Sequence, residues 1–461
     1  MLYNIYRQIQ FHSLEIPLPL KKPFLIYATK ITPRLEYTVR LIFGQILGQE
    51  VRIVDDTVDL LGDEQPWFNY SSQRFGSEPF IKADPLLFNE EVIIPPPDSA
   101  EDEGVTGFFP VSGDCLMRFD PLASAFYMVT RMEEYTSGER DNHGRFQAKN
   151  SILHRAGLLG KPVVNLWALL LFKKLKDFYP FPELPEKAFS VRITIDVDNA
   201  WAYRGKGWIR TAGSILRDIG SRKWTSVTDR FAVMAGLKQD PYDTYAYLFK
   251  TLEGRREQVL FFFHVGNYGR YDRPVFWKNA AYKQLIREVA SLFRVGIHPS
   301  YLSSSEGDNR RVMMEKGRLE QITGSPITCS RQHYLRLDIP DTYRKLIHSG
   351  ITEDYSMGYA EITGFRAGIC TPFRFYDLKE EKETSLIVYP VPVMDVTLRN
   401  YMGLKAEDAA KTITKLRQEI QNAGGTLVVS WHNESVTDEG EWANYRSVFE
   451  QVITGNANEE T

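Results

Sequence analysis

The stretch Val191-Arg-Ile-Thr-Ile-Asp-Val-Asp-Asn-Ala-Trp201 has the clearest local pattern in the chain. Apolar and polar side chains alternate along it, and this period of two predicts a strand. Because successive side chains of a strand point to opposite faces, Asp196 and Asp198 leave it on the same face. Two neighbouring carboxylates repel each other unless a cation, a shared proton or water relieves them. Active sites of α/β proteins lie at carboxyl ends of strands, so the stretch fits such a site as well as a solvated acidic turn.

Short apolar segments alternate with helical segments over the remainder of the chain. The predicted strands are 191–197, 258–265, 295–298, 327–333, 351–354, 385–394 and 426–431. The predicted helices are 244–256, 277–292, 310–322, 342–349 and 406–423. This alternation predicts parallel βα units. Seven strands without a glycine-rich dinucleotide fingerprint favour a distorted (β/α)7-type barrel over an open doubly wound sheet.

The length of 461 residues predicts two domains. We place an N-terminal α/β accessory domain of unknown role at 1–185 and the barrel at 186–461, with the Pro-rich segment 179–189 between them. The first part carries no chemical motif. We predict a polar, Pro-rich loop at 95–104, and His143 in a second, charged loop is interpreted as solvated. A helical insertion at about 204–240 holds eight Lys and Arg against three Asp. It fits a lid, an oligomer contact or a membrane-surface helix, as well as a basic face in solvent.

Composition and charge exclude several classes of protein. The formal net charge of −3 gives no electrostatic case for nucleic acid as a partner. Three cysteines without CxxC spacing are too few for a disulfide framework. No secretory signal precedes the first strand, and the apolar run 162–173 has about half the length of a membrane span. We therefore expect a cytoplasmic protein without a transmembrane segment.

Polar residues suited to chemistry fall at or near the predicted strand ends. These residues are Asp196, Asp198, His298, Arg331, His333, Arg366, Asp395 and His432. The chain has only eight histidines, so three of them at strand ends indicate a site and not chance.

The order of these strand ends along the chain, and the residues around them, resemble the motifs of the polysaccharide deacetylase family. This family comprises the carbohydrate esterases with a NodB-type domain. The resemblance covers about residues 188–440 and looks like a divergent two-domain bacterial branch. The matching segments are Thr194-Ile-Asp-Val-Asp198, Gly296-Ile-His-Pro-Ser-Tyr301, Gly364-Phe-Arg-Ala-Gly368, Asp395 and Val429-Ser-Trp-His432. The resemblance implies a NodB-like barrel and a metal-dependent hydrolase that removes an N-acetyl or related acyl group from a sugar.

The histidine motif departs from the family pattern. The family has two histidines four residues apart, whereas here Leu302 stands four residues after His298. A metal ion would therefore need a third protein ligand from elsewhere. We predict His333, because its strand end follows that of His298 and would lie beside it in a barrel. His264, inside the apolar run 259–265, is the weaker alternative, since such a histidine more often belongs to the core.

The resemblance also assigns roles within the site. It implies that Asp198 binds the metal with His298, that Asp196 is the general base and that His432 is the general acid. One carboxylate and two imidazoles suit zinc or a similar divalent ion. We expect Asp395 to support a protonated His432, and Arg366 to pair with Asp196 and keep it ionised.

Three further residues are candidates for contacts with a carbohydrate substrate. Arg331 fits a substrate contact and a structural ion pair equally well, and the rings of Tyr301 and Trp201 fit sugar stacking as well as core packing. The sequence predicts neither the sugar nor the oligomeric state.

The incomplete histidine motif leaves a second interpretation open, a degenerate domain that binds glycan or serves as a scaffold without turnover. A phosphatase-type aspartate pair is disfavoured, because Ala200 stands where such a site needs a hydroxyl.

Overall fold

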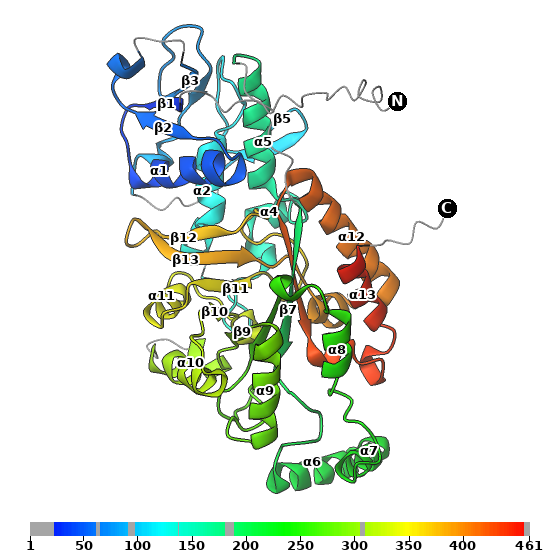
Figure 1. Cartoon of the computed structure of the whole chain (residues 1–461). Helices are drawn as coiled ribbons and strands as arrows, with labels where there is room; N and C mark the ends of the chain where they lie inside the picture. Colours follow the sequence, from blue (N-terminus) through cyan, green and yellow to red (C-terminus); the bar gives the residue numbers. More distant parts are fainter. Residues whose placement is uncertain are drawn as a thin grey trace, which may run out of the picture.

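The computed structural model describes residues 23–60, 65–90, 97–136, 138–179, 189–304 and 309–455. Most of the predicted Pro-rich linker, and part of the predicted loop at 95–104, lie outside these ranges. The described chain forms three sheets, and the N-terminal sheet lies at the opposite end of the molecule from α6 and α7 (Figure 1).

The largest sheet is a curled, mixed sheet of nine strands. Its order is β12-β13-β11-β10-β9-β8-β7-β15-β14. Its strands are β7 (Ser190–Val197), β8 (Val259–Phe263), β9 (Arg294–Ile297), β10 (Cys329–Ser330), β11 (Glu353–Met357), β12 (Phe373–Asp377), β13 (Lys382–Pro390), β14 (Val393–Met394) and β15 (Thr426–His432). The pair β12–β13 is antiparallel, and the other pairs are parallel.

Each of the seven segments predicted as strands contains a strand of this sheet. The prediction was wrong in two details. The segment 327–333 is extended only at Cys329–Ser330, because a helical turn begins at His333. The edge strand β12 was not predicted; it forms a hairpin with β13 through the turn at Asp377–Lys382.

Helices connect and cover these strands. They are α6 (Trp208–Gly220), α7 (Trp224–Met234), α8 (Tyr245–Thr251), α9 (Ala280–Leu292), α10 (Asn309–Thr323), α11 (Asp341–His348), α12 (Ala406–Ala423) and α13 (Arg446–Thr454). Helix α12 has the bounds predicted from its apolar spacing, and it buries Ala409, Ile413, Leu416 and Ile420 on one face. Strand β8 is buried at every residue, as expected for a parallel strand covered on both sides.

The N-terminal part contains a parallel sheet of order β2-β1-β3-β4 and a short antiparallel hairpin. Its elements are β1 (Phe24–Ala28), β2 (Val51–Val54), β3 (Trp67–Ser71), β4 (Phe80–Lys82), β5 (Ser99–Asp102), β6 (Val105–Phe108), α1 (Pro33–Val39), α2 (Pro121–Val129), α3 (Met132–Thr136), α4 (Ile152–Arg155) and α5 (Val163–Lys176). Asp120 caps α2 by accepting from the backbone of Leu122 and Ala123, and Pro121 occupies the first helical position. The expected loop at 95–104 in fact includes β5.

The N-terminal part shares one hydrophobic core with the large sheet. The cluster of buried apolar residues runs without interruption from Phe24 in β1 to Ile453 in α13. The apolar run 162–173 forms most of helix α5. This helix buries Trp167 and Leu171 in the shared core. Among the described helices, none is long and apolar enough to cross a bilayer.

Candidate metal and catalytic site

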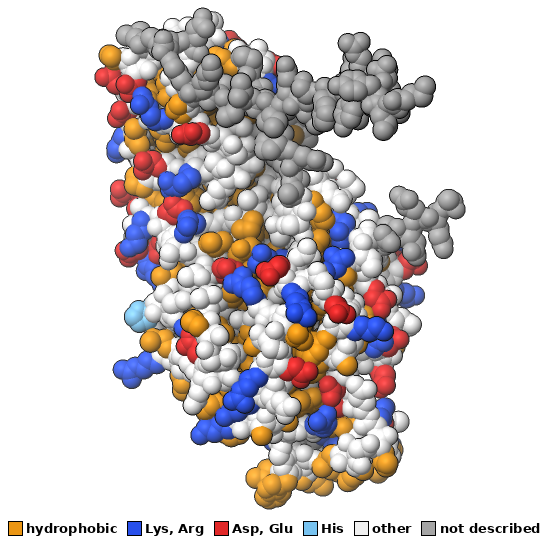
Figure 2. Space-filling view, in the orientation of Figure 1, with side chains coloured by type: hydrophobic (Ala, Val, Ile, Leu, Met, Phe, Trp, Pro, Cys, Tyr) orange, Lys and Arg blue, Asp and Glu red, His pale blue; other side chains and the backbone are white. Residues whose placement is uncertain are grey.

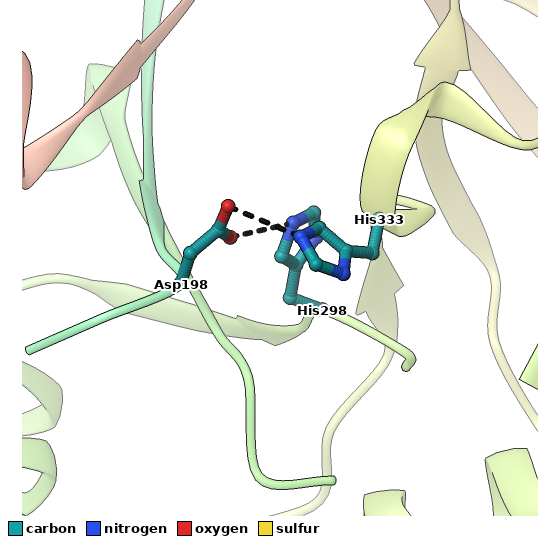
Figure 3. Close-up of side chains that lie close together, drawn as sticks. All are labelled: Asp198, His298 and His333. Carbon is teal, nitrogen blue, oxygen red and sulfur yellow. Dashed lines mark hydrogen bonds and ion pairs between the residues drawn. The ribbon is translucent and has the colours of Figure 1, made fainter. Parts of the chain in front are cut away.

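The carboxyl ends of the parallel strands bring Asp198, His298 and His333 together. Asp198 follows β7, His298 follows β9, and His333 lies three residues beyond β10. The side chains converge, with 3.0 Å between Asp198 Oδ1 and His298 Nε2 and 3.2 Å between Asp198 Oδ2 and His333 Nε2 (Figure 3). One candidate ligand atom from each residue lies within 4.8 Å of the others.

The far nitrogen of each imidazole fixes its tautomer. His298 Nδ1 donates to the carbonyl oxygen of Arg331 at 2.6 Å, and His333 Nδ1 donates to Asp272 Oδ1 at 2.9 Å. A neutral ring then directs the lone pair of Nε2 at Asp198. Three electron-pair donors that face one another repel unless a cation or protons lie between them. This donor set, with its hydrogen-bonded outer partners, therefore fits a divalent ion such as zinc.

The electrostatics of the three residues agree with a site built for positive charge. Burial alone would raise the pKa of Asp198, but the adjacent rings of His333 and His298 outweigh burial and hold this pKa well below its usual range. Burial opposes a charge on His333, yet Asp198 and Asp272 raise its pKa to about 9. Without a metal ion, the site would therefore gain a proton in its place.

Asp272 and His264 form a second layer behind these residues. Asp272 Oδ1 lies 3.2 Å from His264 Nε2 and also accepts from the backbone of Tyr301 at 2.8 Å. His264 contacts Asp272 and the carbonyl oxygen of His298, so it is one layer away from Asp198. Sequence reasoning missed Asp272, whose only sequence signal is a carboxylate in the loop that follows β8.

Asp196 lies in β7 and is 2% exposed, with Arg331 as its ion-pair partner. Arg331 Nη1 donates to Asp196 Oδ1 at 3.1 Å and to Oδ2 at 3.3 Å, and Ser430 Oγ donates to Oδ2 at 3.1 Å. Oδ1 keeps a lone pair for a further hydrogen bond. Arg331 is fully buried, with Nε donating to the carbonyl oxygen of Tyr355 at 2.9 Å. Of the two interpretations of Arg331, the structure therefore favours the ion pair over substrate contact.

The expected pairing of Arg366 with Asp196 is wrong. Arg366 lies between the N-terminal part and the large sheet, where its Nε and Nη2 donate to the two oxygens of Glu134 at 2.8 and 2.5 Å. Glu134 also accepts from Arg131 Nε at 2.8 Å. The sequence around Arg366 did not show in which direction this side chain points. The partner of Asp196 is Arg331, directly after β10.

His432 is the last residue of β15 and pairs in register with Asp196 of β7. Its Nδ1 donates to Asp395 Oδ1 at 2.9 Å, and its Nε2 lies 3.8 Å from Asp198 Oδ2. Asp395 also accepts from the backbone N–H of His432 and from Ser435 Oγ. Burial opposes a charge on His432, but Asp395, and then Asp198 and Asp196, raise its pKa well above the usual range.

These residues line a cavity of about 610 Å³. Residues that sequence reasoning did not place there include Arg145, Arg270, Tyr271, Tyr334, Tyr401 and Glu434. Arg145 comes from the N-terminal part, next to the loop residue His143, which contacts Tyr301 Oη through Nδ1 at 3.1 Å. Burial raises the pKa of Glu434 to about 7. Aromatic and charged residues in loops carried no periodic signal that could have identified them.

Trp201 and Tyr301, predicted as sugar-stacking rings, do not line this cavity. Trp201 is 5% exposed and packs against Tyr282, and the ring of Tyr301 is covered by Tyr271 and by the guanidinium of Arg336. Apart from the histidines, the rings that line the cavity are those of Tyr271, Tyr334, Tyr401 and Trp442.

A protein family of unknown function (DUF7033) matches residues 24–180. A search of curated proteins found no match. Among solved structures, a protein described as a polysaccharide deacetylase from Mycobacterium smegmatis is 16% identical with a TM-score of 0.39, over 59% of this chain and 85% of that one. An allantoinase is 11% identical with a TM-score of 0.37, over 58% and 84%.

The polysaccharide deacetylase Bc1974 from Bacillus cereus is 11% identical with a TM-score of 0.29, over 58% of this chain and 87% of that one. We base no functional conclusion on likenesses at this level.

Proposed function

We propose that the protein is a metal-dependent hydrolase that removes an N-acetyl or related acyl group from a sugar. The observation that carries the proposal is the convergence of Asp198, His298 and His333 beside the ion-paired Asp196 and the Asp395-supported His432. A divalent ion held by the first three residues supplies Lewis acidity, which lowers the pKa of a water molecule and polarises an amide carbonyl.

In this proposal Asp196 acts as the general base. Arg331 neutralises its charge inside the protein, while Oδ1 retains a free lone pair toward the cavity. Asp196 can therefore accept a proton from the attacking water, a step typically worth about 10²–10⁴ in rate.

His432 acts as the general acid on the other side of the site. The carboxylate of Asp395 orients its ring and stabilises the imidazolium, so Nε2 carries the proton that the leaving amine requires. The carbon–nitrogen bond breaks, and the products are the free amine and the carboxylic acid. Three tyrosine rings and three arginines of the cavity wall suit a sugar ring with its hydroxyl groups.

We also infer that the large sheet belongs to a distorted (β/α)7-type barrel. Only Val391 and Pro392 separate β13 from β14, and these strands pair with β11 and β15. Counting them as one interrupted strand gives seven parallel strands with β12 as an addition. The division into an N-terminal accessory domain and this barrel at about residue 185 is part of the same proposal.

The test is metal analysis of the purified full chain together with acetate release from N-acetylated sugar oligomers. We expect bound zinc or a related ion, and a melting temperature that rises on zinc addition, because a ligand of the folded state stabilises it. His333→Ala should lose the metal, whereas Asp196→Asn and His432→Ala should keep the metal and lose turnover.

His348→Ala is the matched control, because His348 is exposed on α11, and it should change neither metal content nor turnover. The enzyme proposal would be contradicted if the chain purified without metal and zinc addition did not change its melting temperature. This result would favour a glycan-binding protein. Full metal occupancy in His333→Ala would remove His333 from the ligand set.

A further inference from the structure

The hairpin of α6 and α7 exposes an unusual amount of apolar surface. It is inserted between β7 and β8 and forms the lowest part of the molecule in Figure 1. Eight of the eighteen exposed large apolar side chains of the described residues lie between 208 and 237, so the exposure is concentrated there. They are Trp208, Ile209, Leu216, Ile219, Trp224, Phe231, Met234 and Leu237. Figure 2 shows hydrophobic side chains along this lower edge.

The hairpin buries polar and charged side chains together with Val227 and Val233, while its large apolar side chains are exposed. Its interior contains a buried ion pair, in which Arg230 Nη2 of α7 donates to Asp218 Oδ2 of α6 at 2.9 Å. A helix that packs on a protein in water shows the reverse order, with its apolar stripe turned inward and its charges outward. This inversion indicates that the outer face of the hairpin is built for an apolar environment.

The exposed residues form continuous stripes. Trp208, Leu216 and Ile219 are eight and then three residues apart, so they share one face of α6. Trp224 and Phe231, seven residues apart, share one face of α7. Trp208 is 80% exposed and Trp224 59% exposed, and each opens its helix. Tryptophan at such edges is typical of the boundary between lipid and water.

Exposed cations accompany this apolar face. Arg217, Arg222 and Lys223 lie exposed at the end of α6 and in the turn to α7. Within the described part of the chain, Arg222 and Lys223 form no ion pair with a carboxylate. The basic turn contrasts with the chain as a whole, whose net charge is −3. A two-fold dimer through this surface would gather the basic turns of both copies in one interface, which disfavours it.

We propose that the α6–α7 hairpin docks the protein on an anionic lipid bilayer. Its tryptophan, leucine and phenylalanine side chains enter the headgroup region, and the cations of the turn contact anionic headgroups. This interaction is peripheral and does not depend on the reaction proposed above.

The hairpin also contacts the loop that lines the cavity. Arg210 of α6 donates to the carbonyl oxygens of Pro274 and Arg273 at 2.8 and 3.1 Å, and Arg273 lines the cavity. The hairpin therefore adjoins one wall of the cavity, and docking through the hairpin brings this wall near the membrane. Resting on the proposed hydrolase function, this placement favours an acylated sugar carried by a lipid as the substrate class.

Co-sedimentation of the full chain with lipid vesicles tests the docking without any measurement of turnover. We expect binding to phosphatidylcholine vesicles that contain phosphatidylglycerol, and binding at least about tenfold weaker to phosphatidylcholine alone. The variant with Trp208, Leu216, Trp224 and Phe231 all changed to Ser should bind at least about tenfold more weakly. Arg222→Gln with Lys223→Gln should remove the preference for anionic lipid.

The matched control changes Val58 and Phe178 to Ser, because these side chains are 63% and 45% exposed in the N-terminal part. It should bind vesicles like the wild type, and circular dichroism should show every variant folded. Absence of vesicle binding, or equal binding by the four-Ser variant, would overturn the proposal. A dimer in light scattering that the four-Ser variant converts to a monomer, without vesicle binding, would assign the face to a second copy and also overturn it.

Discussion

Replacing Glu134 by Gln should destabilise the fold through the junction between the N-terminal part and the large sheet. Glu134 is 1% exposed and accepts hydrogen bonds from Arg366 and Arg131. Burial raises its pKa, but the two guanidinium groups prevail and lower it from the usual 4.5 to about 2. A lowering of this size corresponds to about 3 kcal/mol of folding free energy. Removing the charge also leaves the buried Arg366 without its carboxylate partner, while Arg131 keeps Glu133. Losses of about 3–5 kcal/mol are typical when one partner of a buried pair is removed.

The pH dependence follows from the sign of this shift. A carboxyl group whose pKa falls on folding stabilises the folded state above its unfolded pKa, and this stabilisation is lost as the pH falls through the folded pKa. For Glu134 the window runs from about pH 4.5 down to about pH 2. About 2 kcal/mol of the contribution should be gone by pH 3.

Urea denaturation of wild type and Glu134→Gln at pH 7, 5 and 3 measures the effect. The difference in free energy of unfolding should be about 3–5 kcal/mol at pH 7 and pH 5. It should narrow at pH 3, because Glu134 is then protonated in the unfolded state and must lose this proton on folding, whereas Gln has no proton to lose. Glu407→Gln is the control; Glu407 lies on the surface of α12, where it pairs with Lys411, and its replacement should have little effect. A difference that stays constant with pH, or that matches the Glu407 control at pH 7, would refute the reasoning.

Two further substitutions, one in the loop after β8 and one in β9, have predicted effects. Asp272→Asn should weaken zinc binding about 10–100-fold in calorimetry, because Asp272 orients the ring of His333, and unchanged affinity would contradict that role. Gly296→Ala should destabilise the fold by about 1–3 kcal/mol in urea, because a Cβ there would lie 2.5 Å from the ring of Phe262 and 2.9 Å from the carbonyl oxygen of Cys329. Gly317→Ala in α10, where nothing lies within 4 Å, is its control and should not destabilise.

Strand positions could be predicted because they depend on local periodicity. The alternation in β7, the apolar run of β8 and the spacing in α12 are each set by burial of one or both faces, which the sequence records directly. From the strand order it was also predicted that His333 would lie beside His298, at the edge where Asp198 ends its strand. The structure places them there.

Pairings between distant side chains could not be predicted in the same way. Arg331 and Arg366 are both buried arginines near glycines or strand ends, and nothing in their local sequence says which one faces Asp196. The choice depends on the direction of each side chain relative to β7. Arg331 lies just beyond β10 and reaches Asp196 beneath the site, whereas Arg366 lies in the segment between β11 and β12 and turns toward Glu134 of α3. Such directions are set by the tertiary structure.

The incomplete histidine motif shows that three candidate metal-binding side chains can converge without the usual spacing of the motif. Leu302, four residues after His298, is 49% exposed in a turn, so the position that breaks the motif faces solvent here. The ring that faces Asp198 comes instead from the neighbouring strand end, where β10 is short and a turn begins at His333. Asp272 then holds that ring by its far nitrogen. The candidate donor atoms and their outer partners are therefore present without the family spacing. Metal analysis of the wild-type chain decides between a hydrolase and a degenerate domain, and the metal content of His333→Ala tests His333 as the third ligand.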